Sequence, residues 1–164
     1  MFLLVVLSLL IGFLVIAWAG RAAHKPTAER EAALPVDGGT LEGLTLAHLE
    51  RLCTHLLEEV GLVVNACTRT GARGLEISAL NPQPIVGGDY LVRCVLAAPG
   101  QLVSASEVSA LGDSVRAERA AKGIFITTGY FAEDVQKIQE GPPMELINRR
   151  RLEELLDTHH IAVA

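Results

Sequence analysis

The pattern of apolar and polar residues after position 44 predicts an amphipathic helix followed by three strands. Behind Thr45, a favourable helix N-cap, apolar residues recur at three- and four-residue steps as far as Gly61. Three short segments rich in β-branched or alternating apolar residues follow, at 62–67, 75–80 and 90–96. Turns rich in Gly and Pro separate them, so we expect an antiparallel meander.

The second half of the chain predicts alternating helices and strands. A capping box from Ser104 to Glu107 precedes a helix that runs to about residue 121. Segment 123–128 is almost continuously apolar, as in a strand covered on both faces. A short helix at 131–139, a strand at 144–147 and a helix at 150–156 complete the order. Because parallel strands need crossover connections, this order predicts a three-layer α/β domain with a mixed central sheet.

The first 20 residues predict a membrane anchor, because they contain no charged residue. A helix of about 20 residues spans the hydrocarbon core of a bilayer. Trp18 lies near the end of this run, and Arg21, His24 and Lys25 follow at once. This asymmetry of positive charge places the C-terminal part in the cytoplasm. The alternative is a cleaved signal peptide with the site at 17–19, although no basic segment precedes the run.

We therefore expect four regions along the chain: a transmembrane anchor at 1–20, a linker at 21–43, a folded domain at 44–157 and a tail at 158–164. The linker contains prolines and a glycine pair but no sustained helical or strand period. The sequence predicts a single-pass membrane protein with a cytoplasmic domain, and it indicates no oligomeric state.

Composition narrows the class of protein further. The chain of 164 residues carries a formal net charge of −5, so it is not a globally basic nucleic-acid coat. From residue 44 onward, 11 Lys and Arg residues face 15 Asp and Glu residues. The cysteines are Cys53, Cys67 and Cys94, an odd number without CxxC spacing, which predicts neither a disulfide framework nor a zinc site.

The candidate chemistry lies on the second and third predicted strands. A sheet whose neighbouring strands carry acidic and basic side chains at adjacent ends can hold a divalent metal, which activates water for phosphodiester hydrolysis. The relevant positions are Glu76 on the second strand and Arg93 and Val95 on the third, with Glu50 on the preceding helix.

At these positions the sequence resembles the Mrr-type restriction endonuclease domain, a member of the PD-(D/E)xK nuclease superfamily. The resemblance runs from about residue 44 to 156, and its most specific part is KGIFITTGYF at 122–131. Weaker parts are LERL at 49–52, GARGLEI at 71–77, YLVRCV at 90–95 and MELIN at 144–148. The resemblance implies a restriction-endonuclease-like fold, DNA binding and magnesium-dependent cleavage of DNA.

Carried over by position, Glu76 takes the place of the family's metal-binding aspartate, and Glu50 that of an acidic residue that assists the metal. Arg93 and Val95 take the places of the two outer residues of the Q/E-x-K motif. A guanidinium offers no lone pair to a metal, and valine has no amine. We therefore expect an ion pair between Arg93 and Glu76 and an inactive site. A catalytic set shifted to Asp89 or Glu107 is the alternative that would keep the site active.

The candidate DNA-binding residues are Arg69, Arg73, Thr127 and Thr128. Both arginines lie on the turn before the Glu76 strand, and both threonines precede a glycine whose amide is suited to a phosphate. Taken singly, each fits equally a solvated charge or an ordinary cap. The leading hypothesis is a membrane-anchored, catalytically inactive Mrr-like domain that binds DNA. The alternatives are an active magnesium-dependent endonuclease of type IV restriction character with a remodelled site, and a non-catalytic interaction module at the membrane.

Overall fold

The computed structural model describes residues 41, 43–137 and 141–163. Among these residues, no helix combines the length and the apolar character needed to cross a bilayer. The predicted anchor and nearly all of the predicted linker lie outside the described residues.

The described part of the chain folds into the α/β order that the sequence predicts, with two additional short strands. Its elements are α2 (Leu46–Glu59), β1 (Val63–Arg69), β2 (Gly74–Asn81), β3 (Gly88–Val95), β4 (Leu102–Val103), α3 (Ala105–Glu118), β5 (Lys122–Thr127), β6 (Tyr130–Phe131), a 3-10 helix (Glu133–Lys137), β7 (Met144–Ile147) and α4 (Arg149–Thr158).

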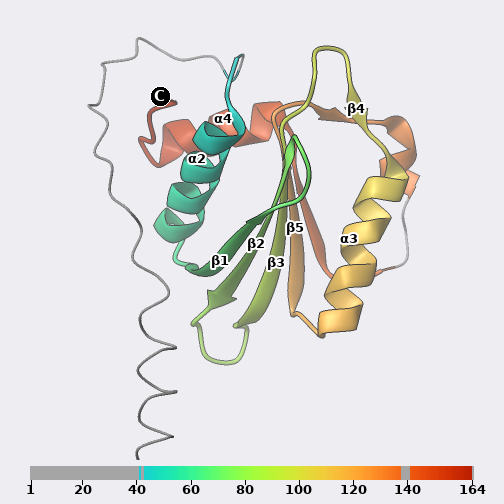
Figure 1. The fold of residues 1–164 in the computed structure, drawn as a ribbon. Coiled ribbons are helices and arrows are strands. Elements are labelled where there is room, and N and C mark those ends of the chain that lie inside the picture. Colours follow the sequence, from blue (N-terminus) through green and yellow to red (C-terminus); the bar gives the residue numbers. More distant parts are fainter. Residues whose placement is uncertain (1–40, 42, 138–140, 164) are drawn as a thin grey trace, which may run out of the picture. The chain divides into compact units, whose positions relative to one another are not determined.

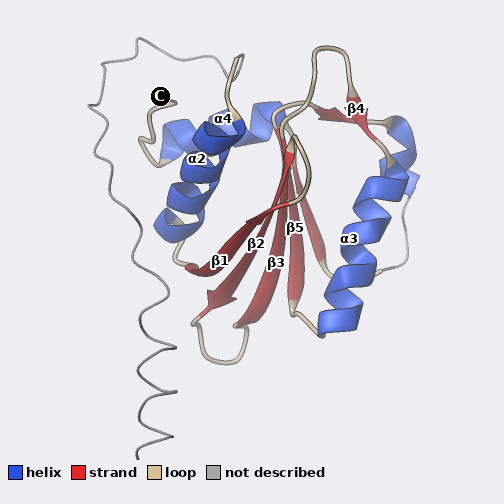
Figure 2. Cartoon of the chain, viewed as in Figure 1, coloured by secondary structure: helices blue, strands red, loops and turns tan. Residues whose placement is uncertain are grey.

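One mixed sheet organises the domain, in the order β1-β2-β3-β5-β7. The first two pairings are antiparallel and the last two are parallel, as the element order predicts. Helices α2 and α4 lie on one face of this sheet and α3 on the other (Figures 1 and 2). The result is the predicted three-layer arrangement, and we call these two surfaces the α2 face and the α3 face.

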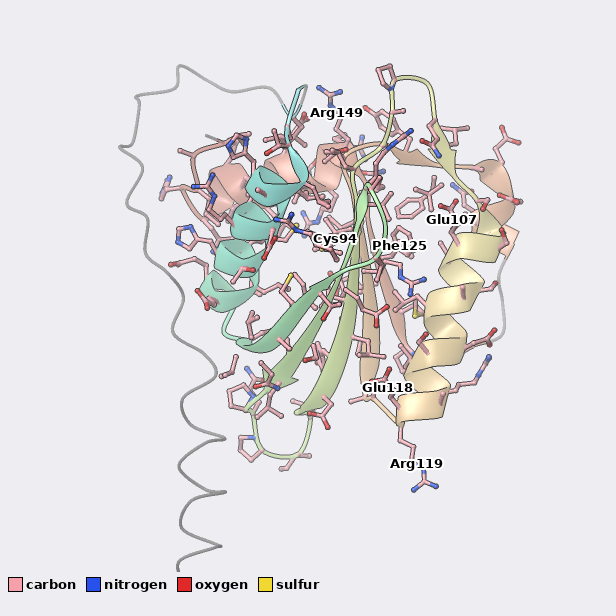
Figure 3. All side chains as sticks on the ribbon, viewed as in Figure 1. Cys94, Glu107, Glu118, Arg119, Phe125 and Arg149 are labelled. Carbon is pink, nitrogen blue, oxygen red and sulfur yellow. The ribbon has the colours of Figure 1, made fainter. Side chains whose placement is uncertain are left out.

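Each face has its own hydrophobic core. The core on the α2 face joins α2 and α4 to the alternate sheet residues Leu75, Ile77, Val92, Cys94 and Ile126. The core on the α3 face joins that helix to Leu91 and Phe125. Figure 3 shows the labelled side chains of Cys94 and Phe125 on opposite sides of the sheet. Because side chains alternate along a strand, this division fixes the face on which every candidate residue lies.

The predicted helix at 131–139 is wrong in extent. The described chain there forms β6 and a 3-10 helix of five residues. Strand β6 pairs in parallel with β4, a strand that the periodicity did not predict. Each of these strands has two residues, which is too short to show the alternation of apolar and polar residues that identifies a strand in a sequence.

The folded part also extends beyond its predicted boundaries. Leu41, assigned to the linker, is buried in the core on the α2 face, and so is Ile161, assigned to the tail. Both ends of the described chain therefore pack on the same core.

Candidate functional site

Glu76 and Arg93 form the ion pair that the sequence predicts. They are direct register partners on the antiparallel strands β2 and β3. Arg93 Nη2 donates to Glu76 Oε2 at 2.7 Å, and the two side chains are 23% and 30% exposed. Both lie on the α3 face. The next residue after Arg93, Cys94, points into the core on the α2 face, and the register partner of Arg93 on β5, Phe125, points into the core on the α3 face. The carboxylate that the sequence resemblance assigns to the family's metal position is therefore bound by a cation.

The guanidinium of Arg93 is only partly satisfied. Its Nε atom is buried and has no hydrogen-bond partner among the described residues. Buried donors in folded proteins almost always have a partner, so an unpaired N–H is an unusual feature. It leaves one buried N–H donor of Arg93 unpaired beside the ion pair.

Val95 ends β3 on the same face as Arg93. It packs against the core on the α3 face and supplies no amine that could orient a water molecule. Among the described residues, no group of three or more His, Cys, Asp or Glu side chains is placed to hold a metal ion. The donor set at this position does not fit the magnesium ion that the family implies.

The structure does not bring Glu50 to this position. Glu50 projects from α2 and accepts from Arg69 at the end of β1, with Arg69 Nη2 and Glu50 Oε2 at 3.1 Å. Arg69 pairs with Leu75, whose side chain is in the core on the α2 face. The expectation that Glu50 assists Glu76 is therefore not met in this structure, because the sheet lies between them.

The two alternative carboxylates are also placed elsewhere or engaged. Asp89 lies four residues before Arg93 on β3, next to the β2–β3 loop. Glu107 closes the predicted capping box, where its carboxylate accepts from the Ser104 backbone N–H at 2.9 Å. Neither forms an ion-binding group with Glu76 in the described structure.

The three cysteines are free and gather on the α2 face. Burial raises the pKa of Cys67 from 9.0 to about 11, and the charge of Glu50 contributes to the rise. The hydrogen bond with Cys53 and complete burial raise the pKa of Cys94 well above its usual value. Because the thiolate is the reactive form, a raised pKa disfavours reaction of these two thiols at neutral pH. Their role in the fold is packing.

A groove of about 620 Å³ opens at the edge of the sheet where β3 and β5 end. Loop 96–101, turn 128–130, Arg73 and Arg149 line it, together with Leu41, Gly43, Leu44 and Leu102. Arg73 reaches across to Gln101, with Nη1 and Oε1 at 2.8 Å. Among the described residues, the lining contains two arginines and no carboxylate, which favours an anion over a cation in the groove.

The two threonines differ in their access to this groove. Thr128 lines it, is 6% exposed, and uses its hydroxyl to accept from the Ala97 backbone N–H at 3.0 Å. Thr127 is fully buried, and its hydroxyl accepts from the Gly129 N–H at 3.1 Å. Both hydroxyls hold the turn that forms the wall of the groove. A DNA-binding role stays a prediction for both, as it does for Arg69 and Arg73.

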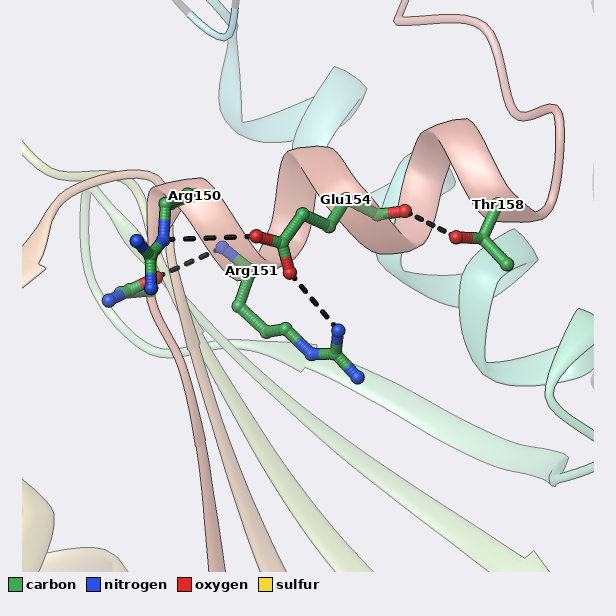
Figure 4. Close-up of polar contacts among 5 residues, drawn as sticks. Arg150, Arg151, Glu154 and Thr158 are labelled. Carbon is green, nitrogen blue, oxygen red and sulfur yellow. Dashed lines mark hydrogen bonds and ion pairs between the residues drawn. The ribbon is translucent and has the colours of Figure 1, made fainter.

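Arg149 is a groove residue that the site prediction missed. It begins α4, its backbone N–H donates to the Gly129 carbonyl at 2.8 Å, and its Nε donates to Glu153. Arg150 and Arg151 follow it, and both contact Glu154 (Figure 4). Cations at a helix N-terminus face the positive end of the helix dipole, and the pairs with Glu153 and Glu154 three or four residues further on offset this repulsion. The run of three arginines at 149–151 is the sequence pattern that could have drawn attention to Arg149.

Comparisons with known proteins bear on the family and the fold of this chain. A sequence model of the Mrr catalytic domain, described as "Restriction endonuclease", matches residues 41–156. No curated protein matches the chain. Among solved structures, the DNA modification-dependent restriction endonuclease AspBHI aligns with a TM-score of 0.52 and 17% identity, covering 88% of this chain and 43% of that one.

The MspJI restriction endonuclease, solved in complex with a 27-mer oligonucleotide, aligns with a TM-score of 0.49 and 18% identity, covering 71% of this chain and 28% of that one. The chain spans less than half the length of either enzyme. The AspBHI alignment shows a shared fold, and the family match extends over nearly all of the described residues. The chain therefore belongs to the Mrr restriction endonuclease family.

Proposed function

We propose that this chain is a membrane-anchored member of the Mrr family that binds DNA and does not cleave it. The observation that carries the proposal is the ion pair between Arg93 and Glu76 at 2.7 Å. Glu76 is the carboxylate at the family's metal position, and its partner is a permanent cation without a lone pair. A magnesium ion at this place would have to displace the guanidinium while being repelled by it.

DNA binding is supported by the family and by the groove at the ends of β3 and β5. Arg73 and Arg149 line this groove, and no carboxylate lines it in the part of the chain that the structure describes. Arg150 and Arg151 follow at the start of α4. The folded part as a whole is acidic, with 15 Asp and Glu residues against 11 Lys and Arg residues from residue 44 onward. We therefore expect weak binding that depends steeply on salt, since phosphate neutralisation by a few arginines supplies the affinity.

Membrane anchoring is supported by the 20 uncharged residues at the start of the chain and the positive charges that follow them. It places the folded domain on the cytoplasmic side. A cytoplasmic position also suits three free cysteines.

A nicking assay tests the central claim. The full chain in a non-ionic detergent, mixed with supercoiled plasmid and magnesium, should leave the plasmid intact. The double variant Arg93→Gln with Val95→Lys should nick it, because it restores both outer residues of the motif and frees Glu76. Adding Glu76→Ala to that variant should abolish the nicking.

Arg69→Gln is the matched control, since it breaks the corresponding Arg–Glu pair on the α2 face. Nicking by the wild-type chain that Glu76→Ala abolishes would overturn the proposal in favour of an active, remodelled endonuclease. A repaired variant that is silent and also fails to bind DNA would favour the interaction module.

A further inference from the structure

The exposed apolar side chains of this domain are concentrated at one end of the sheet. Eight large apolar side chains are exposed among the described residues, and five of them lie at the end opposite the arginine-lined groove. They are Val60 after α2, Val63 at the start of β1, its register partner Leu80 near the end of β2, and Ile85 and Val86 in the β2–β3 loop. We call these five residues the apolar tip.

The loop at the centre of the apolar tip is built to present its side chains. Ile85 is 104% exposed and Val86 65% exposed. Ile85 also has φ +79°, a left-handed conformation that is costly for a β-branched residue. The Asn81 side chain holds the loop by accepting from the Gln83 N–H at 3.0 Å, and a Cβ on Gly87 would collide with the carbonyls of Asn81 and Gln83. The left-handed backbone conformation of Ile85 is therefore held by the loop, and it directs the isoleucine side chain into solvent.

An exposed apolar cluster of this kind marks a contact with a membrane or a protein. A stable protein interface takes roughly 20–30 residues from each side, far more than the apolar tip offers. A bilayer needs no such area when the domain is already tethered to it, because a tether keeps the second contact at a high effective concentration.

We propose that the apolar tip inserts into the bilayer that holds the N-terminal anchor, with Ile85 and Val86 in the acyl region. This rests on the anchor proposed above for residues 1–20. The length of the linker permits this insertion. The described chain begins with Leu41 at the groove end of the sheet, and the eight-residue strand β2, which runs from that end to the apolar tip, is about 26 Å long. A linker of the length of residues 21–40 can span about 65–70 Å when extended, which exceeds this distance.

The charges at this end support an apolar rather than an electrostatic contact. Arg119, in a left-handed C-cap of α3, is exposed and points away from the helix at this end (Figure 3). Glu58, Glu59 and Asp89 lie there too. The mixture gives no net attraction to anionic lipid, so insertion is insensitive to salt. Insertion also turns the groove and its arginines away from the membrane, toward soluble DNA.

Tryptophan quenching in reconstituted vesicles tests the proposal. The full chain is placed in phosphatidylcholine vesicles whose acyl chains carry bromine, which quenches nearby indoles. The variant Trp18→Phe with Ile85→Trp has a single tryptophan at the apolar tip. It should lose about half of its emission relative to unbrominated vesicles, because the tip sits at the acyl boundary. The matched control is Trp18→Phe with Leu102→Trp, an exposed apolar position at the groove end, which should lose none.

Quenching at position 85 that persists in high salt and that Val86→Asp removes would support insertion. No quenching at 85, equal quenching at 85 and 102, or a blue-shifted but unquenched emission that indicates a protein contact would overturn it. Trp18 in the wild-type chain reports the anchor separately. If Trp18 is quenched and the indole introduced at position 85 is not, the anchor holds and the insertion proposal fails. If only the indole at position 85 is quenched, the apolar tip contacts the bilayer without the anchor, and the tethered insertion proposed here fails together with the anchor.

Discussion

Arg93 and Arg69 each form an ion pair with a glutamate, but the two pairs have different surroundings. Arg93 is 23% exposed and its partner Glu76 30%, whereas Arg69 is 59% exposed and its partner Glu50 34%. Solvent screens the second pair more strongly. If the guanidinium of Arg93 is removed, the partly buried carboxylate of Glu76 is left without a compensating charge.

Replacing each arginine by methionine therefore separates the two contributions. Arg93→Met should lower the free energy of unfolding by about 1–2 kcal/mol, because a partly buried carboxylate loses its charged partner. Arg69→Met should lower it by less than about 1 kcal/mol. Urea unfolding followed by circular dichroism measures both. Equal losses would show that the Arg93–Glu76 pair has no special stability.

The thiols on the α2 face make stability depend on alkaline pH. Burial raises the pKa of Cys67 from 9.0 to about 11 in the folded chain. Below pH 9 both states keep the thiol protonated, and its contribution is complete. Between pH 9 and 11 only the unfolded chain ionises, so the free energy of unfolding should fall through this window.

Urea unfolding at about pH 8 and about pH 10.5 measures this fall. Cys67→Ala should make this decrease in the free energy of unfolding smaller, because one of the groups whose ionisation causes the decrease is then absent. Cys94 contributes in the same direction, since its pKa is raised too. The same slope in Cys67→Ala and the wild type would contradict the assignment.

At the residue scale, the sequence predicts the pair but not the place of the second carboxylate. Glu76 and Arg93 lie on adjacent strands of a predicted hairpin, and register makes them neighbours on one face. Glu50 lies on a helix, and the face of the sheet that a helix covers depends on the path of the whole chain. That path is a tertiary property, which the periodicity of a single element does not contain.

At the scale of elements, the groove is formed where strands end and connections begin. Its wall is the turn at 128–130, which Thr127 and Thr128 hold by hydrogen bonds to the Gly129 and Ala97 N–H groups. The long helices and strands follow from capping and periodicity, as the capping box of α3 shows. The β4–β6 pairing and the groove arise from contacts between distant short segments, so no local pattern reveals them.

Arg73 is the groove residue on which a DNA-binding test is clearest. Arg73→Gln should weaken the binding of a fluorescent duplex about fivefold at low salt, uniformly across sequences, and reduce the salt slope by about 1. Arg69→Gln is the control, because Arg69 does not line the groove and its guanidinium is bound to Glu50. Fluorescence anisotropy measures both. A larger effect of Arg69→Gln would move the DNA contact away from the groove.

At the scale of the whole molecule, the two ends of the sheet have different character. The end with the groove has arginines, and the other end has the apolar tip. The family's fold is retained across nearly all of the described chain. The proposed loss of catalysis is compatible with a retained fold, because a few side chains carry the chemistry and many carry the packing.

Magnesium titration by calorimetry measures whether Arg93 keeps a metal ion away from Glu76. The full chain in non-ionic detergent should show no saturable heat beyond that of Glu76→Ala, because Arg93 occupies the carboxylate at the family's metal position. Saturable binding by the wild-type chain that Glu76→Ala abolishes would contradict this expectation, since a metal would then displace the guanidinium from Glu76.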